Sequence, residues 1–149
     1  MISRKQFVER LDRYIEVCRD AGIRVTPQRT EILRYLAGSG EHPDAETIYK
    51  RVRKVMPAMS LDTVYRTLRL FEQKGVIVRM GAGCERARFD ANTTQHHHFV
   101  CTDCGMVRDF YDDRFDRLKP PRGVEDMGYV NAAYVELRGV CERCQKKRK

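Results

Sequence analysis

The sequence lacks any long apolar run. No segment approaches the roughly 18 apolar residues that a membrane-spanning helix requires. The charged residues make up 34% of the chain, and the mean hydropathy is −0.60. Residues 1–10 are polar and lack the apolar core of a signal peptide. These absences exclude a helical membrane protein, and we expect a soluble, cytoplasmic protein with no membrane partner.

Internal repeats and low-complexity segments are also scarce. Only a pair of Cys-x-x-Cys motifs is repeated, and only the basic segment 146–149 is compositionally biased. A length of 149 residues permits one domain or two small ones. The sequence shows no evident substrate pocket and no further acid/base pair, so we do not expect an enzyme.

Positive charge is in excess, and it is uneven along the chain. Residues 1–83 carry 16 Lys and Arg against 10 Asp and Glu, whereas residues 84–149 carry 13 against 11. The excess in the first part indicates a polyanionic partner for that part. A solvated basic surface without a partner is the alternative.

The first half has the periodicity and the capping residues of four helices. Thr26 is a good N-cap with Pro27 at the first helical position, and Gly22 and Gly75 suit helix ends. We expect the third helix to turn Ile48, Val52 and Val55 inward. The helices are predicted over about residues 3–19, 27–36, 44–55 and 60–74.

Two short strands around a glycine turn follow the fourth helix, over residues 76–80 and 86–90. Helices followed by a two-stranded wing is the order of a winged helix-turn-helix domain, in which the fourth helix would enter the major groove of DNA. A small helical bundle with a basic surface is the alternative. The outward residues expected to contact DNA are Ser60, Asp62, Thr63, Tyr65, Arg66 and Arg69.

From Asp90 onward, the pattern is that of a small α+β domain with three strands and one short helix. We therefore expect an α+β protein of two domains. The boundaries are predicted as a winged-helix DNA-binding domain over 1–84, a hinge over 85–92, and an α/β dimerisation and metal-binding domain over 93–149.

Four of the six cysteines form two Cys-x-x-Cys knuckles, which together offer four thiolates for a tetrahedral Zn²⁺ site. The 36 residues between the knuckles exceed the usual zinc-finger gap of about 15–20. This spacing indicates a staple between distant segments. A redox pair or two disulfides is the alternative. The predicted ligands are Cys101, Cys104, Cys141 and Cys144, whereas Cys18 and Cys84 are expected to be packing residues or incidental thiols.

Three consecutive histidines precede the first knuckle. On a strand, His96 and His98 point to one face and His97 to the other. Asp90 and Asp109 flank this strand in sequence. Imidazole with carboxylate suits Fe²⁺, Mn²⁺ or Zn²⁺. The alternative is that these histidines are merely exposed polar residues.

Together, these motifs resemble the ferric uptake regulator family over nearly the whole chain. The segments that carry the resemblance are GIRVTPQRTEIL (22–33), HPDAETIYKRV (42–52), MSLDTVYRTLRLFEQKGVI (59–77), RFD (88–90), HHHFVCTDCG (96–105) and GVCERC (139–144). The resemblance implies a homodimeric, metal-responsive repressor that binds double-stranded operator DNA.

The resemblance also implies a role for each matched ligand. The four knuckle cysteines match the family's structural zinc site. His42, Asp90, His96, His98 and Asp109 match the regulatory Fe²⁺ or Mn²⁺ site, which spans the two domains. A metal that binds only one arrangement of the domains couples to DNA if DNA prefers the same arrangement.

The acidic ligands indicate which branch of the family is nearest. Asp90 and Asp109 with three histidines resemble the peroxide-sensing branch, in which Fe²⁺ reacts with hydrogen peroxide and a ligand histidine, here His42 or His96, is oxidised. An iron-uptake regulator is the alternative, because the arginine at position 66 resembles the residue of that branch. Two further alternatives are a metalloenzyme and a zinc-stapled DNA-binding protein without sensing.

The chain departs from the family in two further places. It lacks a histidine before the last strand, and LKPPRGVEDMG (118–128) breaks the helix expected there. These departures predict no third metal site and a trimmed dimerisation domain. His97 is expected to be exposed or to support a ligand.

Overall fold

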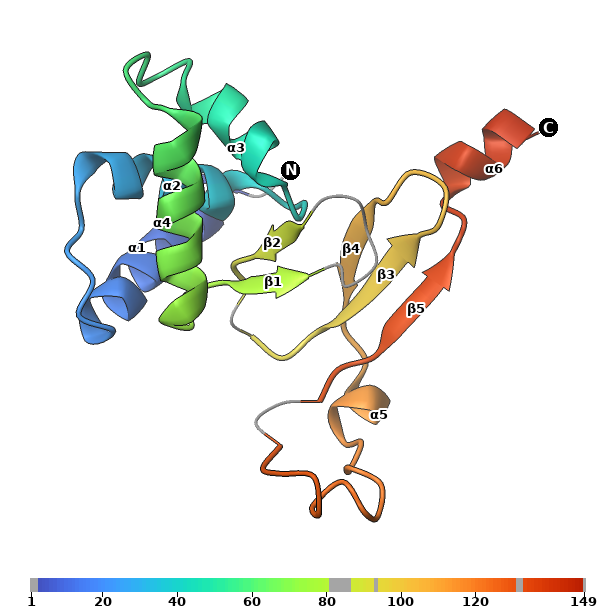
Figure 1. The fold of residues 1–149 in the computed structure, drawn as a ribbon. Helices are drawn as coiled ribbons and strands as arrows, with labels where there is room; N and C mark the ends of the chain where they lie inside the picture. Colours follow the sequence, from blue (N-terminus) through green and yellow to red (C-terminus); the bar gives the residue numbers. More distant parts are fainter. Residues whose placement is uncertain (1–2, 81–86, 93, 131–132, 149) are drawn as a thin grey trace. The chain divides into compact units, whose positions relative to one another are not determined.

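The chain forms two compact units, Met1–Thr93 and Thr94–Lys149, in the computed structural model (Figure 1). The structure describes residues 3–80, 87–92, 94–130 and 133–148. Across these ranges, no helix combines the length and the apolar character that a bilayer crossing would need.

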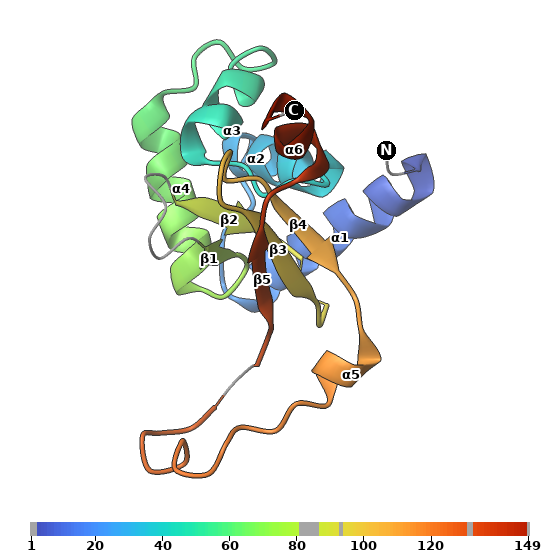
Figure 2. The ribbon, with the colours of Figure 1, turned by 90° about the vertical axis from the view of Figure 1, so that its right-hand side faces the viewer.

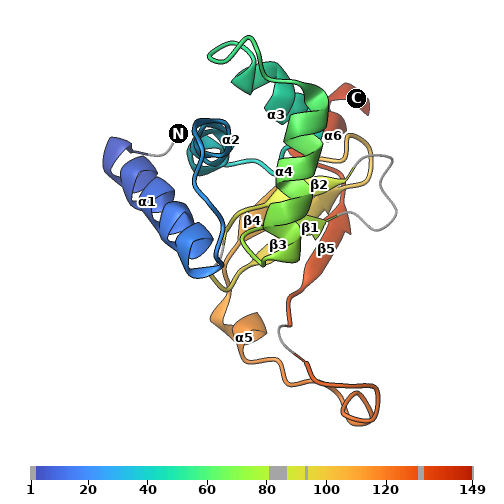
Figure 3. The same cartoon turned by 60° about the vertical axis from the view of Figure 1, so that its left-hand side comes forward.

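The first unit has the order of a winged-helix domain. Helices α1 and α2 contact each other, and α2 and α4 both contact α3 (Figure 3). Strands β1 and β2 then pair antiparallel, with Met80 opposite Arg88. The glycine turn expected between them lies outside the described residues. The elements are α1 (Arg4–Asp20), α2 (Pro27–Gly38), α3 (Ala45–Val52), α4 (Leu61–Gln73), β1 (Val78–Met80) and β2 (Arg88–Asp90).

The helices of this unit begin where the capping residues predict. The Ser3 side chain accepts from the Gln6 N–H and the Gln6 side chain accepts in return, which makes a capping box. Side-chain oxygens of Thr26, Asp44 and Ser60 accept a backbone N–H three residues later at α2, α3 and α4. Gly22 and Gly75 follow α1 and α4 with φ of 72° and 71°, which glycine adopts without a steric penalty.

One apolar core holds this unit together. Six side chains at its centre are completely buried: Ile32, Leu33, Ile48, Val64, Leu68 and Phe71. The inward positions predicted for Ile48 and Val52 of α3 are confirmed, because both side chains are buried. The prediction for Val55 was wrong, because α3 ends at Val52 and the Val55 side chain is 69% exposed. A turn at residues 53–55 carries this side chain away from the helical face.

The second unit is a three-stranded sheet with β3 at its centre (Figure 2). Strand β4 pairs with β3 antiparallel, so that His98 lies opposite Asp109. Strand β5 pairs with β3 parallel, so that Cys101 lies opposite Gly139. The strands are β3 (His97–Cys101), β4 (Val107–Phe110) and β5 (Glu136–Gly139).

Two helices flank this sheet in sequence. The short α5 (Asp113–Asp116) follows β4, and most of residues 117–130 are exposed and form no helix. The break predicted at 118–128 is therefore observed. The helix α6 (Glu142–Arg148) includes most of the basic segment, and the sequence did not predict it. It begins directly after Cys141 and carries Cys144 on its first turn.

Candidate metal centres and nucleic-acid interface

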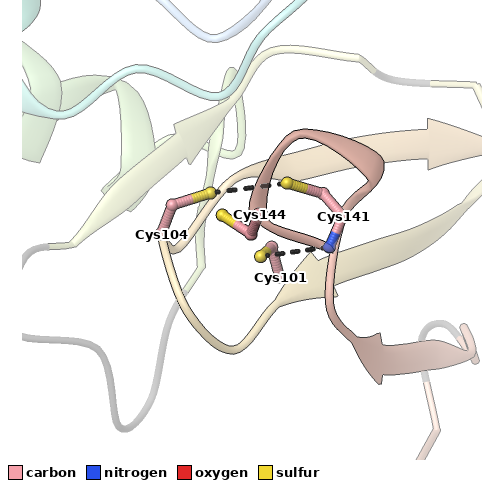
Figure 4. Close-up of side chains that lie close together, drawn as sticks. All are labelled: Cys101, Cys104, Cys141 and Cys144. Carbon is pink, nitrogen blue, oxygen red and sulfur yellow. Dashed lines mark hydrogen bonds between the residues drawn. The ribbon is translucent and has the colours of Figure 1, made fainter. Parts of the chain in front are cut away.

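The four knuckle cysteines meet at one end of the sheet (Figure 4). Cys101 ends β3 and Cys104 lies in the turn before β4, whereas Cys141 and Cys144 come from the start of α6. All four sulfur atoms lie within 4.8 Å of one another. The Sγ atoms of Cys104 and Cys141 are 3.8 Å apart. None of the five cysteines in the described ranges forms a disulfide.

Backbone N–H groups favour thiolates in the first knuckle. A hydrogen bond from the Cys141 N–H, 3.3 Å from the Cys101 Sγ, is the main reason that the pKa of Cys101 falls to about 6. The pKa of Cys104 is lowered, mainly by the Met106 N–H. The pKa of Cys144 rises to about 12, because its side-chain hydrogen bond to Cys141 and burial oppose a further negative charge. A divalent cation would offset the repulsion between neighbouring thiolates, and a group of four thiolates suits Zn²⁺.

Charged residues other than the four cysteines also hold this site. The Arg148 guanidinium lies 2.6 Å from the Asp103 carboxylate, so α6 is tied to the loop between Cys101 and Cys104. A side-chain hydrogen bond to Cys104 raises the pKa of Arg143. The sequence pattern did not predict a role for these residues. Their only local signal was an arginine within the second Cys-x-x-Cys motif.

A second candidate centre in this unit consists of two imidazoles and a carboxylate. The Nε2 atoms of His96 and His98 lie 3.7 and 3.8 Å from the same oxygen, Oδ1 of Asp109. The Nδ1 of His96 donates to the Thr94 carbonyl at 2.6 Å, which fixes the tautomer with its Nε2 turned toward Asp109. Both histidines are buried. The sheet register brings these three side chains together, as their spacing predicts, and they could hold Fe²⁺, Mn²⁺ or Zn²⁺.

His97 lies on the opposite face of β3 and has a different environment. Its side chain is completely buried, so of the two expectations, exposure or support of a ligand, exposure was wrong. The Val135 N–H donates to its Nδ1 at 3.1 Å, and its Nε2 then donates to Asp116 at 3.0 Å. The rings of Phe110 and Phe115 lie 5.4 and 5.5 Å from its ring. His97 therefore joins β3 to α5 and to the segment before β5.

The first unit contributes one more histidine–carboxylate pair. The Nε2 of His42, in the loop before α3, lies 3.5 Å from Oδ1 of Asp90 at the end of β2, and both side chains are buried. Arg88 donates to the His42 carbonyl at 2.9 Å, and the Phe89 N–H donates to the Pro43 carbonyl at 3.1 Å. These bonds hold the loop against β2.

The exposed face of α4 carries the residues predicted to contact DNA. Tyr65, Arg66 and Arg69 are exposed, opposite the buried side of the helix. Ser60 and Thr63 cap its N-terminus, with their hydroxyl oxygens 2.8 Å apart. A hollow of about 780 Å³ lies beside this face. It is bounded by α4, the start of α3 and the two strands, with lining residues that include Asp62, Tyr65, Arg66, Arg69, Arg79 and Phe89.

The two remaining cysteines are not part of these sites. Cys18 is 1% exposed and lies in the apolar core of the first unit, where burial raises the pKa of its thiol. The prediction that it is a packing residue is confirmed. Cys84 lies outside the described residues.

Comparison with known proteins gives consistent matches. The model of the ferric uptake regulator family matches residues 20–131. The chain is 37% identical to the peroxide operon regulator of Bacillus subtilis over 133 residues, which cover 89% of this chain and 92% of the relative. It is 37% identical to the peroxide-responsive repressor PerR of Staphylococcus aureus over 139 residues, 92% of this chain and 93% of that protein.

A solved structure gives the same result for the fold. The chain is similar to the ferric uptake regulator of Pseudomonas aeruginosa with manganese, at 31% identity and a TM-score of 0.68. The match covers 87% of this chain and 98% of that structure.

Proposed function

Because the chain belongs to the ferric uptake regulator family, we propose that it is a metal-responsive transcriptional repressor that senses peroxide. One observation carries the proposal. An exposed helix face that carries Tyr65, Arg66 and Arg69 lies in one unit, and a histidine–carboxylate centre lies in the other. A DNA-binding surface and a separate metal centre on one chain are what a metal-controlled DNA-binding protein requires.

The regulatory metal would bind ligands from both units. His42 and Asp90 would come from the first unit, and His96, His98 and Asp109 from the second. Residues 85–92 would act as the hinge between the domains 1–84 and 93–149. A metal that needs both sets of ligands favours one arrangement of the units. To move such an equilibrium from 1:99 to 99:1 takes about 5.5 kcal/mol of differential binding, which five ligands can supply.

Peroxide sensing is the finer part of the proposal. Bound Fe²⁺ would supply the redox chemistry, and the chain's own contribution would be to hold an imidazole of His42 or His96 beside it. In the net reaction, one oxygen atom of hydrogen peroxide is inserted into an imidazole C–H bond to give C–OH, and the other oxygen atom leaves as water. The altered ring is a poorer ligand, so the metal and then the DNA would be released. Mn²⁺ would support DNA binding without this reaction. The names of both curated relatives support the peroxide signal.

The functional protein would be a homodimer. Leu137 on β5 and Tyr129 in the segment before it are 45% and 91% exposed, although both are apolar. Such side chains are typical of a protein–protein interface, and β5 lies at one edge of the sheet within its unit. Sedimentation velocity that found only monomer at micromolar concentration would exclude this arrangement.

A regulator is favoured over a metalloenzyme. Both curated relatives are named as regulators of gene expression. A catalytic metal would also need an open coordination position and turnover. Multiple turnover of any substrate by the metal-loaded protein would reverse this preference.

The decisive experiment compares two metals. Anaerobic DNA binding is measured with Fe²⁺ and with Mn²⁺, before and after a short peroxide pulse, and mass spectrometry locates any added oxygen. We expect the iron sample alone to lose DNA binding and to gain one oxygen on His42 or His96. His97 is an internal control, because both of its ring nitrogens already have protein partners.

Other outcomes select the alternatives. DNA binding that requires metal but survives the pulse unoxidised would support an iron-uptake regulator. DNA binding that is unchanged by Fe²⁺ and Mn²⁺ would support a zinc-stapled DNA-binding protein without sensing.

A further inference from the structure

The face of α4 proposed to meet DNA contains an acidic residue. The Asp62 side chain is 75% exposed and lines the same hollow as Tyr65, Arg66 and Arg69. Its Oδ2 lies 3.7 Å from the Nη1 of Arg66, one helical turn further along. A carboxylate among DNA-facing arginines requires an explanation, because it repels the phosphates of every DNA sequence.

Helix stability alone does not account for this residue. An acidic residue in the first turn stabilises a helix only weakly, and an exposed ion pair contributes little. The N-terminus of α4 already has its Ser60 cap. A carboxylate that faces a phosphate repels it, and this repulsion grows as water leaves the interface.

The chemistry of the side chain suggests a role in reading bases. An ionised carboxylate only accepts hydrogen bonds. In the major groove, Asp and Glu accept from the N4 amino group of cytosine, whereas Arg donates to O6 and N7 of guanine. Residues four apart on a helix are neighbours on its surface. Asp62 and Arg66 can therefore address neighbouring base pairs at the same time.

We propose that Asp62 is a specificity-determining residue for the operator. Its carboxylate accepts from a cytosine amino group and orients the Arg66 guanidinium toward the adjacent base pair. On other sequences the Asp62 carboxylate faces hydrogen-bond acceptors and phosphates and finds no donor, so it weakens binding to those sequences. The inference rests on the proposed DNA-binding function. In this proposal Asp62 increases the difference in affinity between the operator and other DNA sequences, and it does not increase the affinity for DNA as a whole.

The test is selection from a random pool of DNA duplexes with the full-length, Mn²⁺-loaded protein at fixed salt concentration. Wild type, Asp62→Ala and Asp62→Asn are compared, and affinities are then measured for the selected and the non-specific DNA. Asp12→Ala is the matched control, because Asp12 is an exposed acid of α1 that does not line the hollow and its loss changes the net charge equally.

We expect Asp62→Ala to lose roughly 5- to 100-fold of the discrimination at one cytosine–guanine pair, as expected for one base contact. Its binding to non-specific DNA should become tighter. Asp62→Asn should shift the preference at that position toward adenine, which asparagine can pair with.

Two results would overturn the inference while the proposed function stands. One is that Asp62→Ala selects the same sequences as wild type with the same discrimination. The other is that Asp12→Ala changes binding as much as Asp62→Ala, which would indicate a simple effect of net charge. If the metal-loaded wild type retains no DNA at all, the proposed function fails and this inference fails with it.

Discussion

The two units of the chain are stabilised by different means. The first has a continuous apolar core contributed by four helices, strand β2 and the segments next to the strands. In the second, the buried cluster consists of Cys101, Cys141 and Cys144, with a few partly buried apolar neighbours. Three buried histidines lie on its central strand or directly before it. The interior of the first unit consists mainly of hydrocarbon side chains. The interior of the second unit consists largely of groups that bind metals or protons.

This difference shows that the same chain can place stability and responsiveness in separate parts. A small sheet with few buried apolar residues gains little from the hydrophobic effect. Metal binding then becomes part of its folding free energy. The first unit has its own core, so the state of the metals need not decide whether it is folded. Three substitutions test this contrast.

The largest effect is expected from loss of the zinc ligands. Cys101→Ser should abolish zinc binding and unfold the second unit, because structural zinc in small domains contributes about 10–16 kcal/mol of apparent binding free energy. Zinc content and two-dimensional NMR spectra give the measurement, and amide signals of the first unit should persist. Cys18→Ala, at a buried cysteine of the first unit, is the control and should keep zinc. A well-ordered, zinc-bound Cys101→Ser variant would contradict the contrast.

An intermediate effect is expected in the apolar core. Leu68→Ala removes a completely buried side chain and should lower the free energy of unfolding of the first unit by about 2–5 kcal/mol. Urea unfolding monitored on the first unit measures the change, and zinc content should not alter. Val55→Ala, at a side chain that is 69% exposed, should change it by no more than about 0.5 kcal/mol. Loss of zinc from Leu68→Ala would show that the two units do not stabilise independently.

The smallest effect is expected at His97. His97→Phe keeps a ring among Phe110 and Phe115 but leaves the Val135 N–H and the Asp116 carboxylate without this partner. An unsatisfied buried group costs about 1–3 kcal/mol, so hydrogen exchange at the Val135 amide should accelerate while zinc stays bound. Asp116→Asn keeps an acceptor for the His97 Nε2 and should change exchange much less. Equal exchange in His97→Phe and wild type would indicate that the buried imidazole contributes packing alone.

Local signals in the sequence predicted much of this structure. Thr26 and Ser60 mark helix starts by accepting the N–H three residues later, and Pro27 suits the first helical position. The two Cys-x-x-Cys motifs indicated the four-thiolate group because each knuckle is a single tight turn. The alternation of His96 and His98 along one strand similarly predicted that they share a face.

What the sequence did not predict depends on distant partners. His97 obtains its role from Asp116 and Val135, which are 19 and 38 residues away, and no local pattern indicates them. Arg148 was interpreted as part of a basic segment, yet it pairs with Asp103 across 45 residues. The prediction for Val55 was wrong for a different reason, because a regular helical period was extended beyond the turn that ends α3.

The parallel pairing of β3 with β5 has a consequence for the biosynthesis of the chain. A chain is made from its N-terminus, and domains fold as units in that order. Residues 1–93 form a compact unit with an apolar core of its own, so we expect that unit to fold while translation continues. The second unit cannot close its sheet or its cysteine cluster until Cys141 and Cys144 have been synthesised. Each newly made molecule therefore passes through an interval in which its helical first unit is complete and its second unit, with the cysteine cluster, is not.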